Sequence, residues 1–354
     1  MGFKLLLFCA VFGYLGRTAA EPVQEHEHVH LWKITHPEME KPSYLLGTLH
    51  VPWKILYNKF PKNIKSAILE TDFVVTEFNN DSTSEVRKSL EKRGASKLLD
   101  NDDLKQRIER DFPKSLLKLP PNWLLIKLGK IHLKWQLKAF DYFARNFFAE
   151  FDEKVRKIGK INEKERRYLE EKEDLGKFFP NVKDDQTLLL IKNDLDNIEA
   201  EKKDGGKNSL KELVEWYKKP EEYTEERLTN CDYQLKNSRE NQNSLDKANV
   251  QYMSDVTHVR NKKWIKKMHN WMVEENPNGQ KSFFFAVGLL HIVCVENNLQ
   301  QLLTEMGYTV EEVPQNTQIR RTDPQPSNVE DEDDQPDYDK PQNDKPENEE
   351  KNSF

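Results

Sequence analysis

Two histidines occupy matching positions in two distant stretches of the chain. Residues 43–50, SYLLGTLH, and residues 282–291, SFFFAVGLLH, each run from an apolar segment through Gly and two further residues to His. Imidazole is the commonest protein ligand for transition metals. Taken alone, either histidine could simply make a hydrogen bond within the core at the end of a strand. The repetition favours a different hypothesis, in which His50 and His291 converge on one metal ion.

The elements that must position these histidines are short strands. Tyr44–Leu46 and Phe283–Val287 are rich in aromatic and branched side chains, which favour strands. Gly47 and Gly288 fall where each strand should stop, and they permit a sharp turn or the close approach of another backbone or a ligand. The carboxyl ends of strands in open α/β sheets border the ligand crevice. We therefore expect His50 and His291 there.

A carboxylate follows the next predicted strand. Residues 72–78, DFVVTEF, place the apolar segment Phe73–Val75 just before Glu77. Because a helix through Leu69 separates this strand from His50, the segment predicts a β-α-β unit whose parallel strands end at one edge of the sheet. Glu77 should then lie beside His50. The alternative is that Glu77 is an ordinary exposed acid at a strand end.

Two histidines and one carboxylate form an open metal shell that leaves a position for water. A divalent ion lowers the pKa of that water and polarises a substrate carbonyl, so the expected chemistry is metal-assisted hydrolysis. Glu77 is either a metal ligand or the general base, and Arg260 can stabilise the developing oxyanion. The chain has no H-E-x-x-H helix motif, no G-x-S-x-G elbow and no P-loop.

The remaining pattern predicts an α+β fold, in which a central mixed sheet with strand-end G-x-x-H motifs carries a large helical insertion. An edge strand is expected at Leu31–Ile34, a charged exposed helix at Glu153–Lys177 and a long helix at Asp246–Glu275. The expected organisation is a signal peptide over 1–20, a catalytic domain over 21–313 with a mainly helical part at 79–245, and a disordered acidic, Pro-rich tail over 314–354.

Composition points to an exported protein that is soluble outside the cell. No stretch after the signal is long and apolar enough to span a bilayer. The net charge of −6 is concentrated in the tail, and the near-neutral remainder argues against nucleic acid as a partner. Cys231 and Cys294 can form one disulfide in an oxidising compartment, and Asn80 begins a glycosylation sequon. The alternating histidines of EHEHVH, residues 25–30, are interpreted as a solvated leader, with a weak surface metal site as the alternative.

Four segments carry a family resemblance: YLLGTLHVPW, DFVVTEFN, VRNKKW and FFFAVGLLHIVCVENNLQQLLTEMGYTVEEV. The chain resembles the TraB/PrgY/GumN group and, within it, the animal Tiki metalloproteases. The resemblance implies a divalent-metal-dependent peptidase that uses Mn²⁺ or Co²⁺, cleaves amino-terminal segments of secreted Wnt proteins and so inhibits Wnt signalling. The positions that match the group's motifs are Gly47, His50, Glu77, Arg260, Gly288 and His291.

Two other functions stay open from the sequence. A secreted protein of this kind can bind a peptide or a signalling ligand without cleaving it. A metal-dependent, esterase-like hydrolase on the same fold is the third hypothesis. Product formation that stops when a chelator is added separates an enzyme from a binder, and small esters tested against peptides separate the two kinds of enzyme.

Overall fold

The chain forms two compact units, Met1–Arg320 and Arg321–Phe354. The computed structural model describes parts of the first unit only. They are residues 28–57, 59–78, 101–119, 121, 124–125, 127–129, 131–132, 151–171, 184–203, 214–215, 217–218, 244–293, 297–314, 317 and 319. The predicted signal peptide, nearly all of the acidic tail, the Asn80 sequon, Cys231 and Cys294 lie outside these residues.

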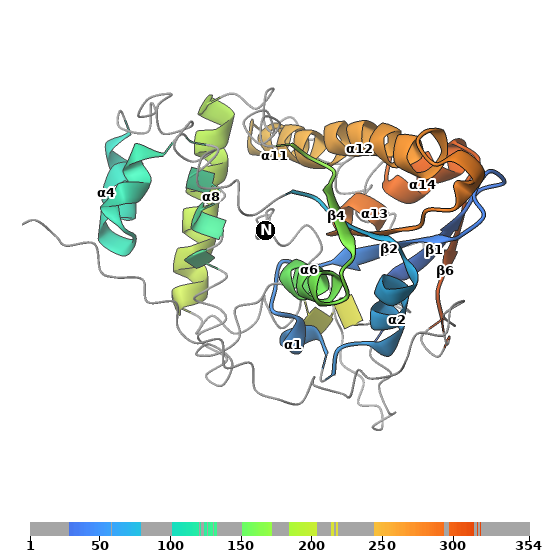
Figure 1. The fold of residues 1–354 in the computed structure, drawn as a ribbon. Coiled ribbons are helices and arrows are strands. Elements are labelled where there is room, and N and C mark those ends of the chain that lie inside the picture. The colour runs from blue at the N-terminus through green and yellow to red at the C-terminus, as the bar shows by residue number, and fades with distance from the viewer. Residues whose placement is uncertain are drawn as a thin grey trace, which may run out of the picture. The chain divides into compact units, whose positions relative to one another are not determined.

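Among the described residues, six strands form a mixed sheet at the centre of the fold, as predicted (Figure 1). Its strand order is β4-β3-β5-β2-β1-β6. The four strands from β4 to β2 run parallel, whereas β1 and β6 join antiparallel. The strands are β1 (Leu31–Thr35), β2 (Ser43–Thr48), β3 (Phe73–Thr76), β4 (Glu165–Tyr168), β5 (Phe283–Gly288) and β6 (Thr309–Glu312).

The central strands are apolar because both of their faces are covered. β5, with the sequence FFFAVG, lies between β2 and β3, and all six residues of β2 are buried. Parallel strands covered on both sides have such nearly continuous apolar runs. The ring of Phe283 stacks on Phe73 of β3, with 4.8 Å between the ring centroids. Each fully buried Phe of β5 contributes roughly 1.5–3 kcal/mol through burial alone.

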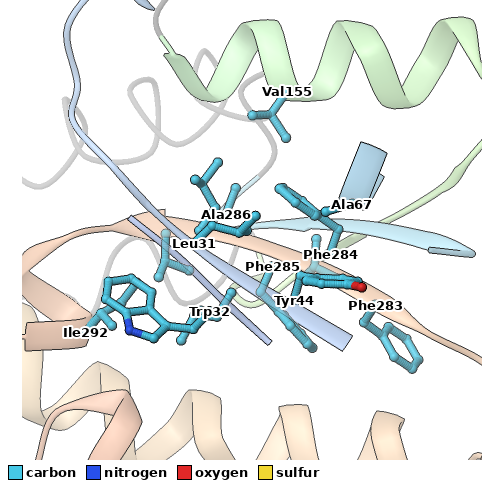
Figure 2. Close-up of a cluster of buried hydrophobic side chains, with 14 of the residues drawn as sticks. Leu31, Trp32, Tyr44, Ala67, Val155, Phe283, Phe284, Phe285, Ala286 and Ile292 are labelled. Atoms are coloured by element: carbon cyan, nitrogen blue, oxygen red, sulfur yellow. The ribbon is translucent and has the colours of Figure 1, made fainter. Parts of the chain in front are cut away.

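Helices cover the two faces of this sheet (Figure 1). The helices α2 and α6 lie on one face, and Val155 of α6 points toward it in Figure 2. On the other face, Trp271 stacks near Phe283. The predicted helix after His50 is interrupted before Pro61, which precedes the first residue of α2. The bounds are α1 (Trp53–Leu56), α2 (Lys62–Glu70), α6 (Phe151–Ile161), α13 (Leu290–Val293) and α14 (Leu299–Glu305).

The structure corrects two predictions about the sheet. The strand expected at an edge, β1, is flanked by both β2 and β6. The charged segment predicted as one exposed helix is instead α6 followed by β4, which pairs with β3 at the true edge. The sequence of β4, ERRY, is charged because its side chains are partly or fully exposed, so no apolar alternation marks it as a strand.

The long helix predicted before β5 is present, with two segments of π-helix in it. It consists of α11 (Ser244–Met253), η5 (Ser254–Val259), α12 (Arg260–His269) and η6 (Asn270–Glu274). π-helical turns in α-helices are frequent at functional sites. The turn η7 (Pro277–Gly279) then leads into β5, and its Asn278 has a φ of 69°. This left-handed conformation is one that Asn tolerates.

A second apolar cluster joins the helices α4 (Asp102–Asp111), η3 (Lys114–Lys118), α8 (Asp184–Lys203) and α11. Leu290 of α13, next to His291, packs against this cluster as well as against the core of the sheet. Within the described ranges, no helix has the length and apolar character that crossing a bilayer requires.

Candidate functional site

Three neighbouring parallel strands end at one edge of the sheet, and a predicted site residue follows each of them. β2 ends at Thr48, β3 at Thr76 and β5 at Gly288, and β5 lies between the other two. His50 follows β2 by two residues, Glu77 follows β3 directly, and His291 lies in the short helix α13 after β5. The parallel arrangement therefore gathers all three at the carboxyl ends of the strands.

The two glycines of the repeated motif serve close approach and not a sharp turn. Neither Gly47 nor Gly288 is among the glycines with positive φ. A Cβ at Gly47, inside β2, would lie 2.5 Å from Leu289 Cδ1. A Cβ at Gly288 would lie 3.3 Å from Oε1 of Glu77 and 3.6 Å from Cδ2 of His291. Gly288 thus leaves room for two of the predicted site residues.

The carboxylate of Glu77 is buried and held on both oxygens. Its Oε1 accepts a hydrogen bond from the backbone N–H of Gly288 at 2.7 Å. Its Oε2 accepts from Nη2 of Arg260 at 2.6 Å. Burial raises the pKa of Glu77, but the Arg260 guanidinium, with smaller contributions from the nearby imidazoles and the Gly288 N–H, outweighs it and lowers the pKa to about 2. Glu77 is therefore an anion at neutral pH.

Arg260, the first residue of α12, connects Glu77 to a second buried carboxylate. Its Nε donates to Oε1 of Glu170 at 2.7 Å, and its Nη2 donates to Oε2 of Glu170 at 3.1 Å. The guanidinium lies over the ring of Trp264, 4.5 Å from the centroid. Trp264 also donates its indole N–H to Oε1 of Glu170 at 3.1 Å. The side chain of Arg260 is thereby fixed from three directions.

His291 has a defined tautomer because of Asn261. The amide nitrogen of Asn261 lies within hydrogen-bonding distance of the carbonyls of His291, at 3.0 Å, and of Asn297, at 3.1 Å. The amide oxygen of Asn261 therefore faces Nδ1 of His291 at 2.7 Å and must accept its proton. The lone pair of the imidazole is then at Nε2, which lies 3.2 Å from Nη1 of Arg260.

Burial and the neighbouring guanidinium keep the His291 imidazole neutral. Both effects lower its pKa, His50 adds to them and Glu77 opposes them, with a result of about 3. The face of the ring lies near Trp264, with 4.4 Å between the centroids. A neutral imidazole next to an ionised carboxylate is the protonation state that metal ligation requires.

His50 lies at the exposed side of this group. Its side chain is 45% exposed, and its Nδ1 lies 3.3 Å from Oδ2 of Asp152 in α6. His50 is near enough to Glu77 and His291 to influence the pKa of both. The structure thus places Arg260 in direct contact with both Glu77 and His291, with His50 as an electrostatic neighbour.

Sequence reasoning missed Glu170, Trp264 and Asp152 as members of this group. Glu170 follows β4 by two residues, and its backbone N–H donates to the carbonyl of Glu77, which follows β3 directly, at 2.8 Å. The position of Glu170 just after a strand could have marked it as a site residue, but the sequence did not predict the strand β4. Asp152 is separated from His50 by about a hundred residues of sequence, so no local pattern relates the two.

The chemistry of these donors fits a divalent cation. One carboxylate is ionised, one imidazole is neutral with its lone pair at Nε2, and an amide oxygen orients that imidazole through Nδ1. Metal-binding histidines usually have such a second partner. In this conformation, however, no three His, Cys, Asp or Glu side chains of the described residues converge closely enough to hold a metal ion. The Arg260 guanidinium is the cation that contacts both Glu77 and His291.

The fold and this group define a mixed α+β protein with a buried charged site at the carboxyl ends of its parallel strands. The chain matches the TraB/PrgY/gumN family over residues 30–312, and so it belongs to that family. The match spans the whole sheet, from β1 to β6, and contains every residue of the site. No curated protein and no solved structure is detectably similar to the chain.

Proposed function

We propose that the protein is an exported, divalent-metal-dependent peptidase, with Mn²⁺ or Co²⁺ as its ion. The support is one observation: an ionised Glu77 and a neutral, oriented His291 meet at adjacent strand ends beside Arg260. His50 supplies the second imidazole, at the exposed side of the group. When bound, the ion lowers the pKa of a water molecule and polarises the scissile carbonyl.

The acidity of Glu77 supports one of the two roles that the sequence left open, that of a metal ligand. A general base works best when its pKa is near the operating pH. The pKa of Glu77 is lowered to about 2, so its carboxylate is a weak base and a good anionic ligand. In this proposal Glu77 and the two histidines would hold the ion.

Arg260 is the residue that stabilises negative charge on the substrate oxygen. Peptide hydrolysis places that charge on the carbonyl oxygen when water adds to the carbon, and the C–N bond then breaks as the amine takes up a proton. The guanidinium is a permanent cation whose orientation Glu170 and Trp264 already fix. Preorganised donors of this kind lose no energy to reorientation during the reaction.

The resemblance to Tiki metalloproteases suggests the substrate class, the amino-terminal segments of secreted Wnt-like proteins. Purified protein is incubated with synthetic peptides of this class, and the products are identified by mass spectrometry. Cleavage should require Mn²⁺ or Co²⁺ and stop with a chelator. His291→Ala should abolish cleavage, whereas the control His269→Ala should retain it, because His269 contacts Tyr308 at the opposite end of α12. Cleavage that persists in folded His291→Ala protein would refute the proposal.

One observation favours the non-catalytic alternative. Arg260 already neutralises Glu77. In this state the site could bind a ligand whose acceptor group pairs with Arg260 and whose donor group pairs with Glu77. A protein that binds peptide with equal affinity with and without a chelator, and yields no product, would be such a binder. Turnover of small esters but not of peptides would instead identify the esterase-like hydrolase.

A further inference from the structure

Two buried carboxylates share one guanidinium in the site. The side chains of Glu77 and Glu170 are 7% and 2% exposed, and each contacts Arg260 within 2.7 Å. Two carboxylates thus share a single guanidinium. Buried ions are stable only when their partners compensate them, so a divalent cation is a suitable second partner for one of the two carboxylates.

The guanidinium is not shared equally. Glu170 accepts from both Nε and Nη2, which is the forked arrangement that gives Arg–carboxylate pairs their strength. Glu77 accepts from Nη2 alone, and its other oxygen is held by the backbone of Gly288. Arg260 can therefore give up Glu77 and keep its two bonds to Glu170.

Trp264 reinforces this asymmetry. Its indole N–H donates to the same oxygen of Glu170 that receives Nε of Arg260, and its ring supports the guanidinium. Glu170 is thus oriented by a donor that does not depend on Arg260. Glu77 has no comparable link to Trp264 among the described contacts.

We infer that Glu170 is a positioning residue that sets the affinity of the site for a divalent cation. Its two hydrogen bonds would keep Arg260 in place while the Glu77 carboxylate binds the cation. Without the charge of Glu170, Glu77 remains as the ionised carboxylate that hydrogen-bonds to the guanidinium among the described contacts, and the guanidinium competes with the cation for it. This inference rests on the proposed metal dependence.

The test is the affinity of the purified protein for Mn²⁺ and for Co²⁺, measured by calorimetric titration without substrate. Glu170→Gln keeps the size and an acceptor oxygen but removes the charge, and it should weaken binding about 10- to 100-fold. The control is Glu171→Gln, which removes the same charge from the next residue, where it is exposed and pairs with Lys267. The control should change the affinity by less than about threefold, because exposed ion pairs contribute little.

A second variant separates positioning from charge. Trp264→Phe keeps the ring beneath Arg260 and every charge, but removes the N–H bond to Glu170. It should weaken cation binding several-fold if Glu170 must be held in place, and it decides the question if Glu170→Gln does not fold. Wild-type protein that binds neither Mn²⁺ nor Co²⁺ would contradict both the proposed function and this inference. Wild-type binding that Glu170→Gln and Trp264→Phe leave unchanged would overturn the inference alone.

Discussion

Acidification from pH 7 to pH 5 should destabilise the fold through His30, a buried histidine of the segment before β1. The ring of His30 is 3% exposed, packs edge-on against Tyr217 and lies 2.8 Å by its Nε2 from the carbonyl of Tyr217. Tyr217 in turn donates its hydroxyl to the carbonyl of Gly47 at 2.8 Å. His30 therefore helps to fix the strand that leads to His50.

The sign and size of the effect follow from burial. Burial, helped by the charge of His28 and opposed by the Tyr217 carbonyl, lowers the pKa of His30 from 6.5 to about 3. The unfolded chain therefore binds the proton more tightly, and stability falls as the pH drops below 6.5. At pH 5 the unfolded His30 is almost fully protonated and the folded one is neutral. The loss between pH 7 and pH 5 is about 2 kcal/mol for this residue.

His30→Phe tests this reasoning because it keeps an aromatic ring and removes the proton site. The variant should be less stable at pH 7, by about 1–3 kcal/mol, because the Tyr217 carbonyl loses a buried partner. Its free energy of unfolding should then fall by about 2 kcal/mol less than that of the wild type between pH 7 and pH 5. Urea unfolding at both pH values measures the two differences.

The control for His30→Phe is Val29→Ala, at the adjacent buried residue. It should cost about 2 kcal/mol at both pH values, since it removes apolar volume and no proton site. If His30→Phe shows the full pH dependence of the wild type, the imidazole is not kept neutral by burial and the reasoning fails.

Replacing Gly47 should mainly lower the stability of the fold, whereas replacing Gly288 should mainly weaken metal binding. Gly47→Ala places a Cβ 2.5 Å from Leu289 Cδ1 and should lower the free energy of unfolding, measured in urea, by about 1–3 kcal/mol. Gly288→Ala places a Cβ 3.3 Å from Oε1 of Glu77 and should cost less than about 1 kcal/mol. Calorimetric titration should nevertheless show weaker Mn²⁺ binding in Gly288→Ala. Equal stability and equal affinity of the two variants would contradict this assignment.

The strands that build the site could be predicted from the sequence, because buried parallel strands are apolar runs that end in recognisable residues. The segments around Tyr44, Val75 and Phe285 are β2, β3 and β5. The rule that parallel strands end together then brings Glu77 near His291. The insertion of β5 between β2 and β3 was not predictable, because strand order depends on contacts separated by more than two hundred residues.

Glu170 and the histidines before β1 escaped prediction for a related reason. β4 consists mainly of charged residues at the sheet edge. Its composition reflects exposure to solvent, and it contains no pattern that indicates pairing with β3. His28 and His30 were interpreted as a solvated leader, but they are 7% and 3% exposed. The cover over His30 comes from Tyr217, a residue 187 positions away, which no local pattern indicates.

The metal content of the purified protein tests the central claim most directly. After dialysis against Mn²⁺ or Co²⁺ and removal of unbound ions, elemental analysis should find a stoichiometric amount of metal in the wild-type protein. Folded His291→Ala protein, treated in the same way, should contain none, because the variant lacks the oriented imidazole opposite Glu77. Equal metal contents in the two proteins, or none in the wild type, would contradict a metal centre at these strand ends.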